Sequence, residues 1–362
     1  MEESFLKFEK WVSDLKSSDR VGVMCHSDAD GLCSGVIILT GIEKLIGKKM
    51  RYVFFQDERA PTKALFNFVI KNKLTRLVVT DMGLGDNKKA LLELTQKVKV
   101  LVIDHHVAKE IEVEGLTIID SHKFKEWKYD PIRYIPSMIA YNFLSKIMDV
   151  TELDWMAVCG LIGDVSTDYW KLFVDKALKR NKLSMKQMEL ITSYINTAKV
   201  FSFEKVEETF WIIKDLSEPS GILKSKLKED YEIVKREVER LKNEFEEKME
   251  KYGRLYFYQI NTKYNLISAI ASTISFNIIS PGDTVVIVGS SDNGKFYVSA
   301  RNRKVTLFMD ELLQEAVRGL DESQAGGHHI AAGCYFRKED LPKFKEQLLR
   351  TYDEMTIRSQ PR

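Results

Sequence analysis

Residues 21–46 read VGVMCHSDADGLCSGVIILTGIEKLI and contain one complete strand–turn–helix unit. The apolar run at residues 21–25 predicts a buried strand, and the apolar spacing of residues 32–46 predicts a helix. Between them stands the polar segment HSDAD, followed by a glycine. A strand that ends in polar residues and continues into a helix is the repeating unit of α/β sheets.

The same alternation continues to about residue 120. Further strands are expected at residues 52–55, 77–80, 100–103 and 117–119, with helices at 61–71 and 87–95. Short apolar runs separated by helices predict an α/β domain whose mainly parallel sheet is covered by helices. Ligands in such sheets bind beyond the carboxyl ends of the strands.

The rest of the chain predicts two further parts. Residues 136–210 are mostly helical, and the charged segment 224–252 carries a near-heptad apolar stripe that predicts a helix of about 40 Å. Such a helix could form a dimeric coiled coil, but a connector packed within the chain is the commoner outcome. Beyond it, strands alternate with helices again in a smaller α/β domain. The expected domains are 1–220, a connecting helix 221–252, and 253–362.

Composition limits the classes of function. Hydrophobic residues make up 44% and charged residues 30% of the chain, as in ordinary soluble proteins. No run approaches the roughly 20 apolar residues that span a bilayer, and the acidic start MEESFLKFEK differs from a signal peptide. We therefore expect a cytoplasmic protein with no membrane association. The net charge of +2 is low for a protein that neutralises a long duplex, which favours short or single-stranded substrates or a local basic patch.

The cysteines and one run of basic residues are weaker indications of function. The four cysteines form no CxxC pair, and Cys25 and Cys33 are best explained as small apolar residues rather than ligands. A basic run follows two aromatic residues and could bind a nucleic-acid strand, although a solvated helix face is the commoner explanation. The run and its aromatic residues are Trp170, Phe173, Lys176, Lys179, Arg180, Lys182 and Lys186.

Four clusters carry the residues of a metal site: HSDADG, the aspartate of TDMG, IDHH and the aspartate of LIGD. Singly, each has a structural explanation, such as helix capping or turn formation. Together they supply imidazoles and carboxylates after apolar segments, where unpaired charges would be costly. Mixed His/Asp ligation suits Mn²⁺ or a comparable ion, and the number of ligands fits two ions with a bridging carboxylate. Such a pair assists phosphoester hydrolysis.

A fifth cluster, AGGHHIAAG at residues 325–333, lies far along the chain. Gly326 and Gly327 would let the backbone approach an anion closely, with His328 as a nearby donor. Arg301, in the segment SARN, is suited to bidentate phosphate binding. Either feature alone is more often structural, but together they predict a phosphate-binding region.

The five motifs, in this order, resemble those of the DHH superfamily of phosphoesterases. GGHHIAAG is similar to the GGHxxAAG signature of the DHH-associated domain of RecJ nucleases and oligoribonucleases. The resemblance covers about residues 20–165 and 255–350, and the long helix resembles the connector of RecJ-like proteins. It implies a catalytic first domain and a substrate-binding last domain. The first motif is spaced HxDxD here, whereas some members with small substrates have HxxxDxD.

The resemblance also implies roles for single residues. One metal ion would be held by His26, Asp28 and Asp81, and a second by Asp30, Asp81, His105 and Asp164. Asp104 would orient a neighbouring ligand and His106 would meet the scissile phosphate. Substrate phosphate would be bound by Arg301, Gly326, Gly327 and His328. The implied cofactors are two divalent ions, Mn²⁺ first and Mg²⁺ as the alternative.

The expected function is that of a two-metal phosphodiesterase of the exonuclease or oligonucleotidase type. Its substrates would be single-stranded DNA or RNA, or short oligonucleotides. The first alternative is a small-nucleotide hydrolase that acts on cyclic dinucleotides or 3′-phosphoadenosine phosphate. The second is a replication factor associated with the GINS complex. The complete set of ligands favours an active enzyme, and a GINS or other repair partner remains compatible with it.

Overall fold

The computed structural model describes residues 1–56, 60–84, 88–106, 111–125, 128–290 and 293–358. The chain divides into two compact units, residues 1–231 and 232–362. Helix α10 (Leu227–Asn243) begins in the first unit and ends in the second. None of the helices in the described part of the chain is long and apolar enough to cross a membrane.

The first unit is built on a five-stranded sheet whose strands are all parallel, in the order β2-β1-β3-β4-β5. The strands are β1 (Val21–Cys25), β2 (Val53–Phe55), β3 (Arg76–Thr80), β4 (Lys99–Asp104) and β5 (Leu116–Asp120). Every strand expected before residue 120 is present, with bounds that differ by one residue at most. The predicted parallel α/β sheet is therefore confirmed.

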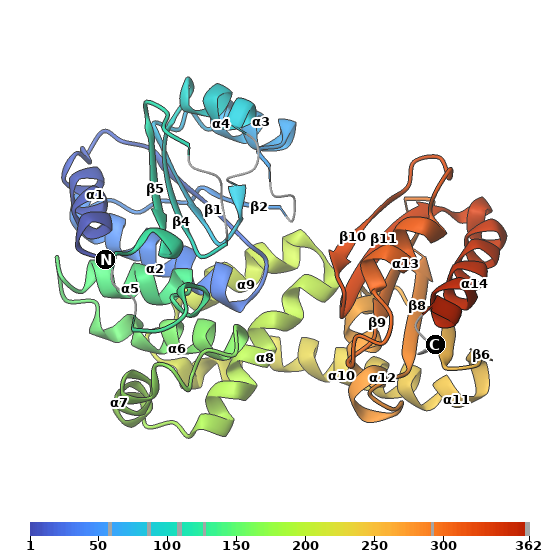
Figure 1. Ribbon diagram of the computed structural model, residues 1–362. Helices are drawn as coiled ribbons and strands as arrows, with labels where there is room; N and C mark the ends of the chain where they lie inside the picture. Colours follow the sequence, from blue (N-terminus) through green and yellow to red (C-terminus); the bar gives the residue numbers. More distant parts are fainter. Residues whose placement is uncertain (57–59, 85–87, 107–110, 126–127, 291–292, 359–362) are drawn as a thin grey trace. The chain divides into compact units, whose positions relative to one another are not determined.

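Both faces of this sheet are buried, which explains its continuous apolar strands. Val100 and Val102 of β4 face a core with α3 (Lys63–Lys71) and α4 (Lys88–Thr95). The alternate residues Leu101 and Ile103 belong to the core on the other face. That face is covered by α1 (Glu2–Ser13), α2 (Ala29–Ile46) and α5 (Pro136–Leu144). Figure 1 shows α3 and α4 on one side of the sheet and α2 and α5 on the other.

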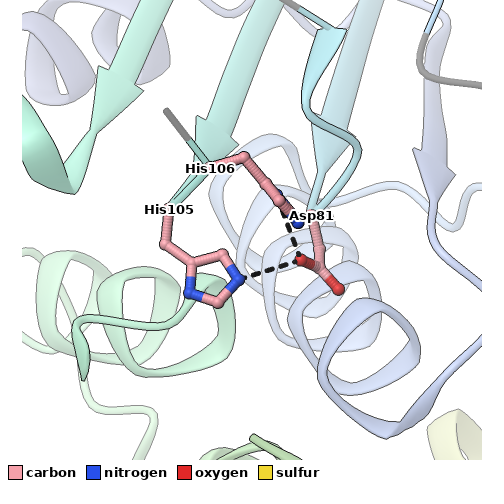
Figure 2. A group of neighbouring side chains, drawn as sticks. All are labelled: Asp81, His105 and His106. Atoms are coloured by element: carbon pink, nitrogen blue, oxygen red, sulfur yellow. Dashed lines mark ion pairs between the residues drawn. The ribbon is translucent and has the colours of Figure 1, made fainter. Parts of the chain in front are cut away.

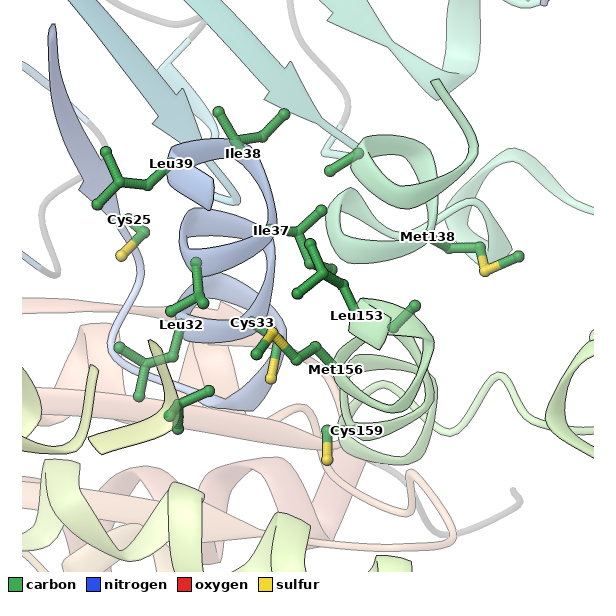
Figure 3. Packing of buried hydrophobic residues seen from close by; sticks show 14 of the residues in the cluster. Cys25, Leu32, Cys33, Ile37, Ile38, Leu39, Met138, Leu153, Met156 and Cys159 are labelled. Carbon is green, nitrogen blue, oxygen red and sulfur yellow. The ribbon is translucent and has the colours of Figure 1, made fainter. Parts of the chain in front are cut away.

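Helix α2 packs against α5 and α6 (Asp154–Gly163) through a mainly apolar interface, in which the Asp30 carboxylate of α2 and Ser137 of α5 form a polar contact. Cys33 and Ile37 point from α2 toward α6, which carries Met156 and Cys159 (Figure 3). All four cysteines are buried and unpaired, and burial raises the pKa of the Cys33 thiol. The cysteines near the first motif are therefore core residues with unreactive thiols.

The remaining helices of this unit are α7 (Lys171–Asn181), α8 (Met185–Phe201) and α9 (Phe203–Asp215). The basic run lies on α7 and the start of α8. Trp170 and Phe173 pack against the core, and the Trp170 indole donates a hydrogen bond to the carbonyl oxygen of Arg133 (2.8 Å). Both rings are thus partly buried against the core, and a role for them in binding a nucleic-acid strand stays a prediction.

The expected long helix is shorter than predicted. Helix α10 ends at Asn243 and is followed by α11 (Phe245–Lys248) and strand β6 (Glu250–Tyr252). The Tyr258 hydroxyl donates a hydrogen bond to the carbonyl oxygen of Leu241 (3.0 Å), and Phe245 packs on the Tyr258 ring. The apolar stripe therefore packs within the chain, and the second unit's own sheet ends the helix.

The second unit has a six-stranded mixed sheet in the order β10-β11-β9-β8-β7-β6. Besides β6, its strands are β7 (Leu255–Ile260), β8 (Thr284–Ser290), β9 (Lys295–Arg301), β10 (Gln324–His328) and β11 (Ala331–Arg337). Helices α13 (Met309–Ala316) and α14 (Leu341–Arg358) cover one face, and α12 (Ile267–Asn277) packs on β8 and β9. The glycine-rich motif at residues 325–333 forms a hairpin: Ala325 to His328 lie on β10, two turn residues follow, and Ala331 to Gly333 begin the antiparallel β11.

Candidate metal centre and phosphate-binding residues

The first three motifs meet because neighbouring parallel strands end at one edge of the sheet. Cys25, Thr80 and Ile103 lie side by side on β1, β3 and β4. The residues that follow them, His26, Asp81 and Asp104, therefore emerge together. The backbone extends this register, since the amide of His26 donates to the Thr80 carbonyl (3.3 Å).

The HSDADG segment serves both as a helix cap and as a donor cluster. Asp28 is the N-cap of α2, and its side chain accepts a hydrogen bond from the Gly31 amide (3.1 Å). A Cβ at Gly31 would lie 2.4 Å from the carbonyl oxygen of His26, so only glycine lets the helix begin so close to the strand. His26 Nδ1 lies 2.7 Å from the Asp28 carboxylate.

Asp81 is the central residue of the cluster. One carboxylate oxygen lies 3.5 Å from Nε2 of His105 and 3.9 Å from Nδ1 of His106 (Figure 2). The other oxygen lies 3.6 Å from Nδ1 of His26. Among the described residues, two groups of side chains have donor atoms close enough together to hold a metal ion, and Asp81 belongs to both. The groups are His26, Asp28 and Asp81, and Asp81, His105 and His106.

Backbone carbonyls fix the orientation of His105. Its Nδ1 donates to the carbonyl oxygen of Ile132 (3.0 Å), which leaves Nε2 facing the carboxylates of Asp81 and Asp164. His122, which no motif singled out, donates from Nε2 to the carbonyl oxygen of His105 itself (3.0 Å). Such partners set the tautomer and the direction of a ligand imidazole.

Asp104 uses its carboxylate within the turn. One oxygen accepts hydrogen bonds from the amides of His105 (2.8 Å) and His106 (3.1 Å) and from Nδ1 of His106 (2.7 Å). The other accepts from the Gly83 amide. Burial alone would raise the pKa of Asp104, but these hydrogen bonds, foremost that of His106, outweigh it and lower the pKa.

Asp30 is almost completely buried behind the cluster. One carboxylate oxygen accepts from the amide and hydroxyl of Ser137, and the other has no hydrogen-bond partner among the described residues. A Cβ at Gly160 would lie 2.2 Å from Asp30, so this glycine makes the space for the carboxylate. Burial, and then the charges of Asp164 and Asp81, raise the pKa of Asp30 well above its ordinary value.

Asp164 follows the last residue of α6 and completes the group. Its carboxylate lies 3.6 Å from Nε2 of His105. Burial, followed by the charge of Asp81, raises the pKa of Asp164 to about 6. Arg133, which no motif singled out, donates to the backbone carbonyl of Val165 (3.1 Å) and so fixes this loop.

The electrostatics indicate that the cluster needs positive charge. Burial alone would lower the pKa of His26 and of His105, but neighbouring aspartates outweigh it and raise both to about 10. The buried carboxylates are thus compensated by protons on imidazoles. Carboxylates that need compensation, an unpaired Asp30 oxygen and oriented imidazoles form a donor set that fits divalent ions.

In the second unit, the predicted phosphate-binding residues lie on β9 and β10, on either side of β11. Arg301 of β9 is in register with Ala331 of β11, which is in register with His328 of β10. Arg301 donates to the hydroxyl of Ser268 on α12 (2.9 Å). Gly327 has a φ of 144°, a backbone conformation that requires glycine. The fold therefore brings Arg301, Gly327 and His328 into one region.

Comparison with protein families decides the assignment of the chain. The DHH family, N-terminal domain, matches residues 20–158, and the DHHA1 domain matches residues 252–354. The chain belongs to the DHH superfamily. Members of the DHH family are metal-dependent phosphoesterases, and the DHHA1 domain of this member lies at its C-terminal end. None of the curated proteins has a sequence that matches it.

Solved structures share the DHH fold at low identity. An exonuclease RecJ bound to manganese is 19% identical, with a TM-score of 0.72 over 97% of this chain and 94% of that one. RecJ from Thermus thermophilus in complex with Mn²⁺ is also 19% identical, with a TM-score of 0.70 over 97% of this chain. This DHH chain spans 54% of that protein. A pGpG-specific phosphodiesterase from Vibrio cholerae is 12% identical, with a TM-score of 0.51 over 93% and 99% of the two chains.

Proposed function

We propose that this DHH protein is a metal-dependent phosphodiesterase of the exonuclease or oligonucleotidase type. Its substrates are single-stranded DNA or RNA, or short oligonucleotides. The observation that carries the proposal is the position of Asp81, which faces His26 with one oxygen and His105 with the other. A carboxylate placed in this way can serve two ions at once.

The assignment of the metal-binding residues follows the motifs and is supported by the geometry around Asp81. His26, Asp28 and Asp81 would hold the first ion, and Asp30, Asp81, His105 and Asp164 the second. When bound, such ions supply Lewis-acid polarisation of the phosphoryl oxygens and of the attacking water. Mn²⁺ is favoured over Mg²⁺ because two imidazoles belong to the set. A ring nitrogen of His106 also lies close to the donor atoms of Asp81 and His105, so His106 would border the second ion as well as the substrate.

The protein groups around the ions have positioning roles. Asp104 fixes the ring of His106, so that the ring meets the scissile phosphate in one orientation as charge develops there. Ile132 and His122 hold His105 through backbone hydrogen bonds. In the second unit, Arg301, Gly326, Gly327 and His328 bind substrate phosphate, with Ser268 directing the guanidinium.

The experiment is an assay of the purified chain with Mn²⁺ on end-labelled DNA, RNA and dinucleotides. We expect mononucleotide products from single strands, no reaction after chelation, and no reaction with an Asp81→Ala variant. Hydrolysis that survives exhaustive chelation and dialysis would contradict the mechanism.

A small-nucleotide hydrolase is the second candidate, favoured by the shared fold of the pGpG-specific phosphodiesterase. The same metal residues serve either substrate, so the two candidates differ in substrate length. Rapid cleavage of a dinucleotide or of 3′-phosphoadenosine phosphate, with no cleavage of longer strands, would establish this second function.

A further inference from the structure

One face of the second unit's sheet is exposed along β10 and partly exposed on β11, whereas on β9 the packing of α12 leaves Ser299 buried and Tyr297 and Arg301 partly exposed. Val298, Cys334 and Phe336 belong to the core with α13 and α14. Side chains alternate along a strand, so Tyr297 and Tyr335 point to the opposite face. Both tyrosines are partly exposed there, and β10 is mostly exposed along its length.

The register of the three strands arranges this face in rows. Starting at the predicted phosphate-binding end, the rows are Arg301–Ala331–His328, Ser299–Gly333–Gly326 and Tyr297–Tyr335–Gln324. Each row advances by two residues, or about 6.6 Å along the strand. The face therefore passes from a basic row, over a row of small residues, to an aromatic row about 13 Å away.

The aromatic row is held in place by its own hydrogen bonds. The ring centroids of Tyr297 and Tyr335 are 5.8 Å apart, with 43° between the planes. The Tyr297 hydroxyl accepts from the amide of Asn293 (2.8 Å), and the Tyr335 hydroxyl donates to Gln324 (3.1 Å). Lys295 lies 4.6 Å above the Tyr335 ring. A hollow of about 300 Å³ lies over these tyrosines and the two glycines.

Neither the backbone conformation nor the packing of the described residues requires glycine at position 326. Its φ is not positive, and a Cβ there would meet no described atom within 4 Å. Glycine inside a strand costs stability and often marks close approach by a ligand. Gly327 differs, because its φ of 144° and contacts with Ala332 require glycine. The open backbone at Gly326 therefore indicates a ligand that passes over the middle row.

We propose that this face binds the single strand of an oligonucleotide substrate. One phosphate lies at Arg301 and His328, the backbone passes over Gly326, and a base about two nucleotides away stacks on the tyrosine row. The lengths agree, since a nucleotide has about twice as many backbone bonds as a residue and so spans about two residues of strand. Aromatic rings beside a basic groove are the usual means of binding single strands without sequence preference. The inference rests on the proposed function and narrows its substrate to strands longer than a dinucleotide.

The test compares a pentadeoxyadenylate with the dinucleotide. In a Tyr297→Leu, Tyr335→Leu double variant of the full chain, we expect KM for the pentanucleotide to rise about fivefold to a hundredfold. KM for the dinucleotide, which does not reach the tyrosines, stays at the wild-type value. Removing the third base of the pentanucleotide should produce the same rise in the wild type and no further rise in the variant. The matched control is Tyr256→Leu, the same change on β7, which lies toward the opposite edge of the sheet.

Two results would overturn the subsite. One is an unchanged KM for the pentanucleotide in the double variant, and the other is an equal loss on both substrates. If the wild type cleaves no oligonucleotide, the proposed function fails, and the subsite is tested by fluorescence anisotropy of labelled pentadeoxyadenylate with chelator present. Binding that weakens when the tyrosines are replaced then supports the subsite, and binding that does not weaken contradicts it.

Discussion

Asp104 holds the ring of His106, because its carboxylate accepts a hydrogen bond from Nδ1 of that ring at 2.7 Å. The same oxygen accepts from the His106 amide at 3.1 Å, and the other oxygen accepts from the Gly83 amide. The carboxylate is thus occupied within its own turn, and it determines where His106 points.

An Asp104→Asn variant should lose turnover and keep its metal. The amide cannot accept from both Gly83 and His106, so the ring loses its orientation. Loss of such a partner costs roughly 10–100-fold in activity. We expect a fall in kcat of that size with unchanged manganese content by elemental analysis. Loss of manganese instead would place Asp104 among the ligands.

Replacing Asp81 should remove more metal than replacing either neighbouring histidine. Asp81→Ala is expected to lose both ions, whereas His105→Ala should lose only one, because Asp81 is the one residue in the described part of the chain that belongs to both donor groups. Turnover should fall well beyond the roughly 10–100-fold of a positioning residue in both. Metal stoichiometry and circular dichroism check this, with the exposed Asp168→Ala as the control. Near-normal turnover in either variant would remove that residue from the site.

Arg301→Ala should weaken substrate binding without loss of metal. A charged hydrogen bond to phosphate contributes about 1.5–3 kcal/mol, so KM should rise about 10–100-fold. Ser268→Ala removes only the contact that directs the guanidinium and should have a smaller effect in the same direction. If the Arg301→Ala protein folds but binds no manganese, the assignment of metal binding to the first unit alone is wrong.

Gly160→Ala and Gly163→Ala form a matched pair on α6. A Cβ at Gly160 would lie 2.1 Å from the Ser137 hydroxyl and 2.2 Å from Asp30, while one at Gly163 would meet Ala29 at an ordinary 3.5 Å. We expect Gly160→Ala to lower the free energy of unfolding by about 1–3 kcal/mol and to reduce activity. Gly163→Ala should leave stability equal or slightly higher. Equal denaturation midpoints would contradict the close contact at Asp30.

The metal-free protein should lose stability as the pH rises. The pKa values of His26 and His105 are about 10 in the fold, against 6.5 ordinarily. A pKa that is raised in the fold adds to the free energy of unfolding. This contribution is complete below pH 6.5 and is lost as the pH rises toward 10. Thermal unfolding in chelator should therefore show Tm falling across this range, and less steeply in Asp81→Asn. Added Mn²⁺ should restore Tm at pH 8, and a flat profile in chelator would contradict the raised values.

The sequence determined the parallel sheet of the first unit and most of the residues at its edge. Its strands can be recognised because both faces are buried, so apolar runs are continuous and polar motifs follow them directly. Strands β1, β3 and β4 are neighbours, and residues that follow neighbouring parallel strands must emerge together. Hence His26, Asp81 and His105 could be grouped from local patterns alone.

Only the tertiary structure decided what supports those residues and how the second sheet is built. Ser137 contacts Asp30 across 107 positions of sequence, and the Ile132 carbonyl that orients His105 has no side-chain signature. The sequence did not predict strand β10, because its glycines have low strand propensity. Pairing with β11 overcomes that propensity in the fold. The rows formed by Arg301, Gly326 and Tyr297 depend on strand register, because register is set by pairing between segments distant in sequence and by the packing of the opposite face.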